Sequence, residues 1–258
     1  MQSWAVVTGA SGGIGREIAR ELAARGHALV LTARSGDALA QLAEELRRTH
    51  GTPSLCCVLD LGSAGGPDAL MQRLAGAGIT PDVLVNNAGI GVYGPFAEAD
   101  PARLQAVIDL NIAALTRLTS LLVPGMLRLG HGRILNVSST AAFQPGPGMA
   151  VYFASKAYVQ SFSEALDAEL RRRRITVTAL CPGPTATGFQ TRAAGERSAL
   201  FHGHMDDARA VARLGVKAML RGRRVVIAGA RNRWMALGVR LAPRRLATVL
   251  TAWFLRET

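Results

Sequence analysis

Cysteine, aromatic side chains and acidic groups are all scarce in this sequence of 258 residues. Three cysteines are present, and Cys56 and Cys57 are adjacent in an apolar run, so neither a disulfide framework nor a zinc-ligand spacing is visible. We expect them to be small buried apolar groups in a reducing compartment. No basic segment, long apolar stretch and cleavage site precede the strand predicted from residue 4, which favours a cytoplasmic protein without a secretion signal.

The shortage of acidic residues makes the chain strongly basic. It has 18 aspartates and glutamates and 30 lysines and arginines, a net charge of +12. Such a charge can indicate binding to nucleic acid, to an anionic membrane or to an anionic ligand. The charge is mostly arginine spread over predicted helices, with runs at 171–174 and 221–224 and no interleaved aromatic residues. We interpret the runs as solvated helix ends and expect no nucleic-acid binding.

A glycine-rich segment, residues 9–15, lies between a predicted strand at 4–8 and a predicted helix at 16–25. Glycines in such a turn let backbone N–H groups approach a phosphate closely, and the start of the next helix adds a favourable dipole. A second strand predicted at 28–32 completes a βαβ unit, the context in which such a loop binds a dinucleotide. The segment therefore predicts a pyrophosphate cradle.

A phenol and an ammonium lie four residues apart at Tyr152 and Lys156. On a helix they would share a face, where the ammonium would favour the phenolate and lower a pKa that is ordinarily about 10. Such a tyrosine could act as a general acid or base. The alternative is an aromatic ring packed under a solvated lysine stem. Thirteen residues upstream, Ser139 follows Ser138 at the end of a predicted strand, where open α/β sheets bind their ligands.

The spacing Thr8-Gly9-x-x-x-Gly13-x-Gly15, together with Tyr152-x-x-x-Lys156, resembles the short-chain dehydrogenase/reductase family. The resemblance extends from residue 4 to about residue 230. It implies an α/β fold, a single Rossmann-like doubly wound domain with a seven-stranded parallel sheet, over residues 1–230. Residues 231–258 are then a helical C-terminal extension, within that domain or peripheral to it.

The resemblance also implies a catalytic set of four residues. Tyr152 would exchange a proton with the substrate oxygen, and Ser139 would hydrogen-bond that oxygen. Lys156 would lower the pKa of the tyrosine and bind the ribose. Asn111, in a predicted helical region at 101–128, would distort the helix and hold a water that relays protons to the lysine; Ser138 would be structural or secondary.

The end of the second strand carries the prediction about the cofactor. An acidic residue about 20 positions after the glycines would hold the ribose of NAD, whereas an arginine accommodates the 2′-phosphate of NADP. Residues 32–35 contain no carboxylate but do contain Arg34, which favours NADP(H) over NAD(H). Ser11 or Ser35 could add donors. The alternative for Arg34 is a solvated loop arginine.

Further cofactor contacts follow from the resemblance alone. Asp60-Leu61 matches the pair that contacts the adenine, and residues 86–89 match a signature whose asparagines bridge strands beside the cofactor. Residues 182–187 would lie over the nicotinamide. The full predicted set is Gly9, Ser11, Gly13, Ile14, Gly15, Arg34, Asp60, Leu61, Asn87, Ala88, Gly89, Tyr152, Lys156, Pro182, Gly183, Thr185 and Thr187.

These predictions indicate an NADP(H)-dependent oxidoreductase that transfers hydride between nicotinamide and a carbonyl or secondary alcohol; the alternative is a non-catalytic NADP(H)-sensing protein. Segments 143–149 and 189–205 are fairly apolar, which suits a hydrophobic ketone, aldehyde, steroid-like or acyl substrate. His202 and His204 lack a third ligand, so no metal is expected. The family favours a homodimer or homotetramer.

The last segment, residues 231–258, follows the last predicted strand. Its apolar run at 246–255 is too short to span a bilayer. Three interpretations stay open: an interfacial membrane helix, packing over the substrate pocket, or packing against another subunit.

Overall fold

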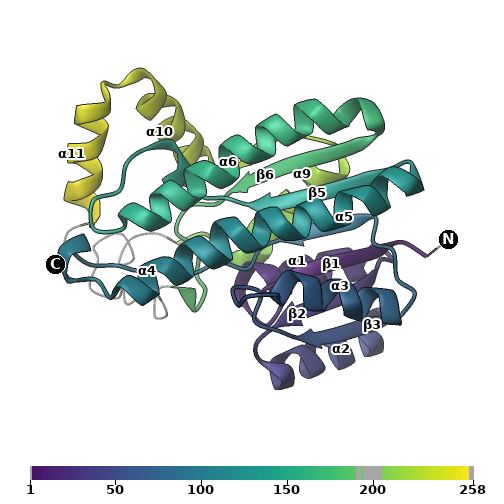
Figure 1. Ribbon diagram of the computed structural model, residues 1–258. Helices are drawn as coiled ribbons and strands as arrows, with labels where there is room; N and C mark the ends of the chain where they lie inside the picture. Colours follow the sequence, from purple (N-terminus) through teal and green to yellow (C-terminus); the bar gives the residue numbers. More distant parts are fainter. Residues whose placement is uncertain (1, 190–192, 194–204, 256–258) are drawn as a thin grey trace.

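The computed structural model describes residues 2–189, 193 and 205–255 (Figure 1). Within them, seven strands form one parallel sheet in the order β3-β2-β1-β4-β5-β6-β7. This confirms the predicted fold class. The strands are β1 (Trp4–Thr8), β2 (Ala28–Ala33), β3 (Ser54–Val58), β4 (Val83–Asn86), β5 (Gly132–Val137), β6 (Ile175–Cys181) and β7 (Val225–Ile227).

Helices connect the strands and cover both faces of the sheet. The α-helices are α1 (Gly13–Ala23), α2 (Gly36–His50), α3 (Gly66–Gly76), α4 (Pro101–Ile108), α5 (Leu115–Leu129), α6 (Ala150–Leu170), α9 (Ala208–Leu220), α10 (Ala230–Leu241) and α11 (Arg244–Leu255). A π-helical segment, η2 (Asp109–Ala114), joins α4 to α5, and short 3₁₀ turns lie at η1 (Phe96–Glu98), η3 (Thr140–Phe143) and η4 (Arg171–Arg173).

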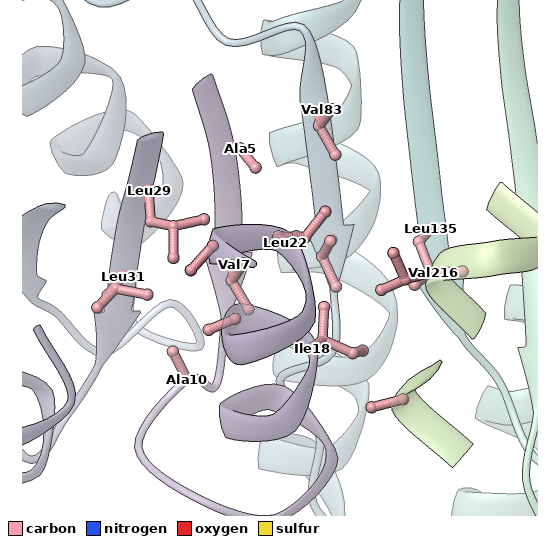
Figure 2. Close-up of a cluster of buried hydrophobic side chains, with 14 of the residues drawn as sticks. Ala5, Val7, Ala10, Ile18, Leu22, Leu29, Leu31, Val83, Leu135 and Val216 are labelled. Carbon is pink, nitrogen blue, oxygen red and sulfur yellow. The ribbon is translucent and has the colours of Figure 1, made fainter. Parts of the chain in front are cut away.

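Strand side chains alternate between two hydrophobic clusters, one on each face of the sheet. In β1, Val7 contributes to the cluster beneath α1, α2 and α9, whereas its neighbour Val6 contributes to the cluster beneath α3 and α5. In β2, Leu29 likewise belongs to the first cluster and its neighbour Val30 to the second. Figure 2 shows the first cluster, with α1 lying across the strands. Because both faces are covered, the strands read as continuous apolar runs in the sequence.

The strand order reverses between β1 and β4, which are neighbours in the sheet. From β1 the chain winds outward to β2 and β3, and from β4 it winds the other way. Loops that leave the carboxyl ends of these two strands therefore separate, and the crevice between them is where doubly wound sheets bind ligands. Both the glycine-rich segment and residues 86–89 lie at this point.

A buried carboxylate accounts for part of the two arginine runs. Asp167 of α6 is fully buried and pairs with Arg171 at 2.8 Å and Arg224 at 2.8 Å. Its Oδ1 also accepts the backbone N–H of Val177 in β6. Arg171 and Arg224 are 40% and 55% exposed, so these arginines are solvated as predicted. Their pairing with Asp167 adds a second role, because it ties the end of α6 to the sheet.

The predicted burial of the cysteines is correct for two of the three. Cys57 and Cys181 are buried, but Cys56 is exposed. The reason is that β3 is an edge strand of the sheet, so alternate residues on it face solvent.

The continuous helical region Pro101–Leu129 is long and apolar enough, by length and composition, to cross a membrane. In this fold, however, Leu118, Leu122 and Met126 of α5 pack into the cluster on one face of the sheet. The apolar character of the region therefore has a structural explanation within the domain.

The last two helices, α10 and α11, form a hairpin at the end of the molecule where the strands finish, drawn in yellow in Figure 1. Each of these helices buries few of its side chains: Ala236 in α10, and Ala247 and Leu255 in α11. The prediction that residues 231–258 are helical is confirmed for the described residues, whereas their separation from the domain stays a prediction.

Candidate active site

A cavity of about 760 Å³ opens at the carboxyl end of the sheet. Its volume lies within the range of about 300–1,000 Å³ that is typical of ligand sites. One end is lined by the glycine-rich segment and Arg34, the middle by Ser139, Tyr152 and Lys156, and the far end by the α10–α11 hairpin. Of the predicted site residues, all but Gly15 and Asn111 line it.

The glycine-rich segment is shaped by close approach to Asn87. Gly9 has φ +66°, a conformation that L side chains rarely adopt. A Cβ added at Gly15 would lie 2.3 Å from Asn87 Nδ2 and 2.4 Å from the carbonyl oxygen of Gly9. Within the described residues no side chain caps α1, so its first N–H groups stay available to an anion at the cavity. The segment therefore has the close backbone approach and the available N–H groups that a pyrophosphate requires, and binding of a pyrophosphate there stays a prediction.

Asn86, the last residue of β4, and Asn87, which follows it, hold neighbouring elements together. Asn87 donates from Nδ2 to the carbonyl oxygen of Thr8 at 2.9 Å. Asn86 donates from Nδ2 to Asn136 Oδ1 at 2.9 Å and to Thr119 Oγ1 at 3.0 Å. The predicted bridging of neighbouring strands is confirmed. Ala88 and Gly89, which follow, line the cavity.

Arg34 and Asp60 lie beside each other at the cavity end near β2 and β3. Arg34 Nη1 is 3.9 Å from Asp60 Oδ2, and the two side chains are 69% and 51% exposed. A loose ion pair between exposed groups holds neither in place strongly. The guanidinium is therefore accessible to a phosphate at this end of the cavity.

Ser139 and Tyr152 meet at the middle of the cavity. Ser139 caps η3, where its Oγ accepts the N–H of Ala141 at 3.1 Å. Burial raises the pKa of Tyr152 to about 12, and the hydrogen bond with Ser139 acts in the opposite direction. The predicted lowering of the Tyr152 pKa is therefore wrong, because desolvation of the phenolate outweighs the neighbouring groups.

Lys156 lies one turn further along α6 and is buried, with its Nζ 5.7 Å from the centroid of the Tyr152 ring. The Nζ donates to the carbonyl oxygen of Val137, the last residue of β5, at 2.8 Å. Burial lowers the pKa of Lys156 to about 8. Ser138 donates to the carbonyl oxygen of Lys156 at 3.0 Å, which agrees with the structural role predicted for that serine.

Asn111 lies in the π-helical segment η2, where the predicted distortion of the helix is confirmed. Its side chain is buried and makes three hydrogen bonds. The Oδ1 accepts the N–H of Ile90 at 3.0 Å, and Nδ2 donates to the carbonyl oxygen of Ile90 at 2.9 Å and to Ser155 Oγ at 3.0 Å. Both amide hydrogens are thus used within the protein. A water relay through Asn111 stays a prediction.

Residues 182–187 pass along the cavity and are held by contacts that the sequence did not indicate. A Cβ on Gly13 would lie 2.9 Å from Thr187 Cγ2, so this segment touches the glycine-rich loop. A Cβ on Gly183 would lie 2.5 Å from Asn232 Nδ2 of α10. Thr185 donates to the carbonyl oxygen of Gly183 at 2.9 Å. Asn232, which lines the cavity, is therefore a site residue missed by sequence reasoning.

An apolar wall surrounds Tyr152 on the side away from the glycine-rich loop. The centroid of the Tyr152 ring lies 5.3 Å from that of Phe189, and the ring packs in a cluster with residues from five segments of the chain. Tyr93 donates from its hydroxyl to the carbonyl oxygen of Leu255. The wall consists of Tyr93, Ala141, Met149, Phe153, Phe189 and Leu255. No motif identifies Tyr93 or Leu255; the apolar composition of their segments was the available signal.

His202 and His204 lie outside the described residues. Among the residues that the structure describes, no group of three or more histidine, cysteine, aspartate or glutamate side chains could hold a metal ion.

Comparison with known proteins agrees with this geometry. Residues 3–197 match the family described as short chain dehydrogenase. A very-long-chain 3-oxoacyl-CoA reductase of Anas platyrhynchos is 40% identical over 190 residues, which are 72% of this chain and 60% of that protein. The protein of the same name from Homo sapiens is 36% identical over 188 residues, again 60% of its length. The chain thus spans about 60% of the curated relatives it matches.

Two solved structures cover nearly the whole chain. A short-chain dehydrogenase from Sphingobium yanoikuyae in complex with NADPH has a TM-score of 0.83 and 33% identity, covering 93% of this chain and 94% of that one. A bulky-bulky ketone specific alcohol dehydrogenase from Comamonas testosteroni has a TM-score of 0.78 and 29% identity, covering 93% and 92%. With the family match over residues 3–197, they show that this chain belongs to the short-chain dehydrogenase/reductase family.

Proposed function

We propose that this protein is an NADP(H)-dependent oxidoreductase that interconverts a carbonyl and a secondary alcohol. The observation that carries the proposal is the cavity itself, which brings Ser139, Tyr152 and Lys156 together with the glycine-rich loop and Arg34. The NADPH complex of the similar Sphingobium yanoikuyae protein supports the choice of cofactor.

The residues present fit a dinucleotide. The glycine-rich loop and the start of α1 would hold the pyrophosphate, and Arg34 would hold the 2′-phosphate. Asp60 and Leu61 would contact the adenine, and residues 182–187 would adjoin the nicotinamide. When bound, NADPH supplies the hydride that reduces the carbonyl carbon.

Tyr152 is the proton donor in the direction of reduction. Because its pKa is raised to about 12, the phenol keeps its proton at neutral pH and can give it to the carbonyl oxygen. Ser139, which shares a hydrogen bond with Tyr152, would donate to the same oxygen as negative charge develops there. Lys156, with a pKa of about 8, exchanges protons near neutral pH and would help to restore the proton of the tyrosine.

The apolar wall indicates the class of substrate. Aromatic and aliphatic side chains surround Tyr152, and the α10–α11 hairpin extends the apolar lining. Relatives are named for very-long-chain 3-oxoacyl-CoA and for a bulky-bulky ketone. We therefore propose a large apolar ketone or 3-oxoacyl ester as substrate.

The test is oxidation of NADPH over a panel of aldehydes, ketones, quinones and 3-oxoacyl esters, with wild type and Tyr152→Phe in parallel. We expect Tyr152→Phe to lose about 10²- to 10⁴-fold in kcat, the range of general acid catalysis, while NADPH still binds. Turnover that survives in the variant would refute the assignment of Tyr152. Tight NADPH binding without turnover by wild type would favour the sensing alternative.

A cytoplasmic location and a homodimeric or homotetrameric state stay predictions. Sedimentation of the purified protein over a range of concentrations would establish the second.

A further inference from the structure

The α10–α11 hairpin exposes an unusually large set of apolar side chains. Leu241 is 80% exposed and Trp234 is 73% exposed, although both are large apolar groups. Monomeric soluble proteins rarely expose contiguous apolar patches of more than a few hundred Å², so such a set points to a binding surface. The exposed apolar residues of the hairpin are Trp234, Met235, Leu237, Leu241, Leu246, Val249, Leu250, Trp253 and Phe254.

Each helix of the hairpin has two apolar faces. In α10, the cavity is lined by Met235 and Val239, four residues apart, whereas Trp234, Leu237 and Leu241 repeat at helical spacing on a different face. In α11, residues at 247, 251 and 255 face the cavity or its wall, and those at 246, 249 and 253 are exposed. The inner faces already have a function in lining the cavity. The outer faces, defined by Trp234, Leu237, Leu241, Leu246, Val249 and Trp253, are not explained by it.

Charge on the hairpin has one sign. Residues 230–255 include five arginines, Arg231, Arg233, Arg240, Arg244 and Arg245, and no aspartate or glutamate. All five are exposed, and of these Arg231 also lines the cavity and Arg240 lies over the ring of Phe143 at 5.7 Å. Apolar side chains with tryptophan among them, bordered by arginine, are the composition of helices that lie in the interface of an anionic membrane.

A second copy of this chain is a poor occupant for the outer faces. In a twofold symmetric dimer the same patch meets itself, so the arginines of one hairpin would approach those of the other. The hairpin supplies no carboxylate to balance them. An anionic partner avoids this repulsion, because positive and negative surfaces attract.

We propose that the outer faces of α10 and α11 dock this protein on an anionic lipid bilayer. Each helix has 12 residues, a length of about 18 Å, which is too short to cross a hydrocarbon core of about 30 Å. The helices therefore lie in the interface, with their apolar side chains among the lipid chains and their arginines at the headgroups. Docking itself does not depend on the proposed reaction.

One consequence does rest on the proposed function. Because the inner faces of the same helices line the cavity, a docked hairpin brings the substrate end of the cavity to the membrane surface. A large apolar ketone dissolved in the bilayer would then reach the site without crossing water.

The test is flotation of the purified full chain with vesicles of phosphatidylcholine alone and of phosphatidylcholine with phosphatidylserine. We expect binding to the anionic vesicles only, weakened as NaCl is raised, because salt screens the arginines. Emission from Trp234 and Trp253 should shift to shorter wavelength as the indoles leave water. Two substitutions, Trp234→Ser with Leu241→Ser, should reduce vesicle binding at least about tenfold, because two large apolar side chains no longer enter the lipid.

Matched variants separate this surface from general effects. Val58→Ser removes an apolar side chain that is 55% exposed on the edge strand β3, and should leave binding unchanged. Arg244→Glu with Arg245→Glu should abolish binding, whereas Arg221→Glu with Arg223→Glu, an equal change in net charge elsewhere, should retain most of it. Circular dichroism confirms that each variant is folded.

Absence of binding to anionic vesicles overturns the proposal. An equal loss of vesicle binding in the hairpin variants and in their controls also overturns the proposal, because net charge alone would then explain the binding. A dimer in solution that Trp234→Ser with Leu241→Ser dissociates, with no vesicle binding by wild type, would assign the outer faces to a second copy instead.

Discussion

Asn111 is paired with both backbone groups of Ile90: its Oδ1 accepts the N–H and its Nδ2 donates to the carbonyl oxygen, at 3.0 and 2.9 Å. A single side chain thus replaces a strand partner for the residue that follows the signature at 86–89. The π-helical turn at η2 places the amide where this pairing is possible. Gly89 lies between Asn111 and Lys156, since a Cβ there would be 3.2 Å from Asn111 Oδ1 and 3.4 Å from Lys156 Nζ.

Replacing Asn111 with alanine should reduce the stability of the folded protein. The substitution leaves the backbone groups of Ile90 without their partner, and each unsatisfied buried polar group costs about 1–3 kcal/mol. We expect a loss of about 2–4 kcal/mol in the free energy of unfolding, measured by urea denaturation. Gln105→Ala, at an exposed position on α4, is the control and should change little. An unchanged midpoint for Asn111→Ala would show that the Ile90 pairing contributes nothing.

Replacing Arg34 with aspartate should reverse the preference between cofactors. A hydrogen-bonded charge at the 2′-phosphate contributes about 1.5–3 kcal/mol, so the ratio of NADPH to NADH affinity should fall about 10- to 100-fold. Fluorescence titration with each cofactor gives the two dissociation constants and therefore this ratio. Arg47→Asp is a matched control, because Arg47 is also 69% exposed but lies outside the cavity. A ratio that responds equally in both variants would remove Arg34 as the phosphate ligand.

Lys156 should destabilise the folded protein at neutral pH. Burial lowers its pKa from 10.5 to about 8, so between these values the unfolded chain binds the proton more tightly than the folded chain does. Stability associated with this group is highest above pH 10.5 and falls as the pH drops toward 8. We expect Lys156→Met to raise the melting temperature at pH 7, and to lose this advantage as the pH approaches 10.5. A difference that is constant across this range would contradict the assignment.

Asp167 should contribute stability to the folded protein that is lost at low pH. Hydrogen bonds from Val177, Arg224 and Arg171 oppose burial and hold the pKa of Asp167 below its usual 3.8. The stabilisation is therefore complete above pH 3.8 and is lost as the pH falls through the lower folded value. Asp167→Asn should lower the free energy of unfolding by about 1–3 kcal/mol at pH 7, because the arginines stay partly solvated. Urea denaturation should show a smaller difference in the free energy of unfolding between Asp167→Asn and wild type below pH 4 than at pH 7. Glu44→Gln, which removes an exposed carboxylate on α2, serves as the control.

The local motifs could be predicted from sequence because each specifies its own geometry. Gly9 needs a positive φ, Gly15 has no room for a Cβ, and Tyr152 and Lys156 lie one helical turn apart. The strand alternation of Val6 and Val7 likewise follows from the period of two in a sheet. The helical spacing and the strand alternation depend on neighbours in the chain, so the sequence displays them directly. The glycines form a recognisable motif, although one of the atoms that exclude a Cβ at Gly15 is Nδ2 of the distant Asn87.

Contacts between distant segments were not predictable in the same way. The approach of Asn232 to Gly183 and the bond between Tyr93 and Leu255 join residues 49 and 162 positions apart, with no motif at either end. The predicted direction of the Tyr152 pKa shift was wrong for a related reason. The burial of Tyr152 depends on the apolar wall that these distant segments form. The exposure of Cys56 followed from the place of β3 at the sheet edge, which strand patterns alone do not reveal.

The bond from Asn87 to the carbonyl oxygen of Thr8 spans 79 positions of the chain. During synthesis, the glycine-rich loop leaves the ribosome long before the asparagine that braces it, and longer still before the segments at 182–187 and 232 that complete the cavity. A nascent chain therefore has no finished cradle for a dinucleotide. By mass action, a ligand of the completed site stabilises only the fully assembled sheet and lends nothing to early folding intermediates.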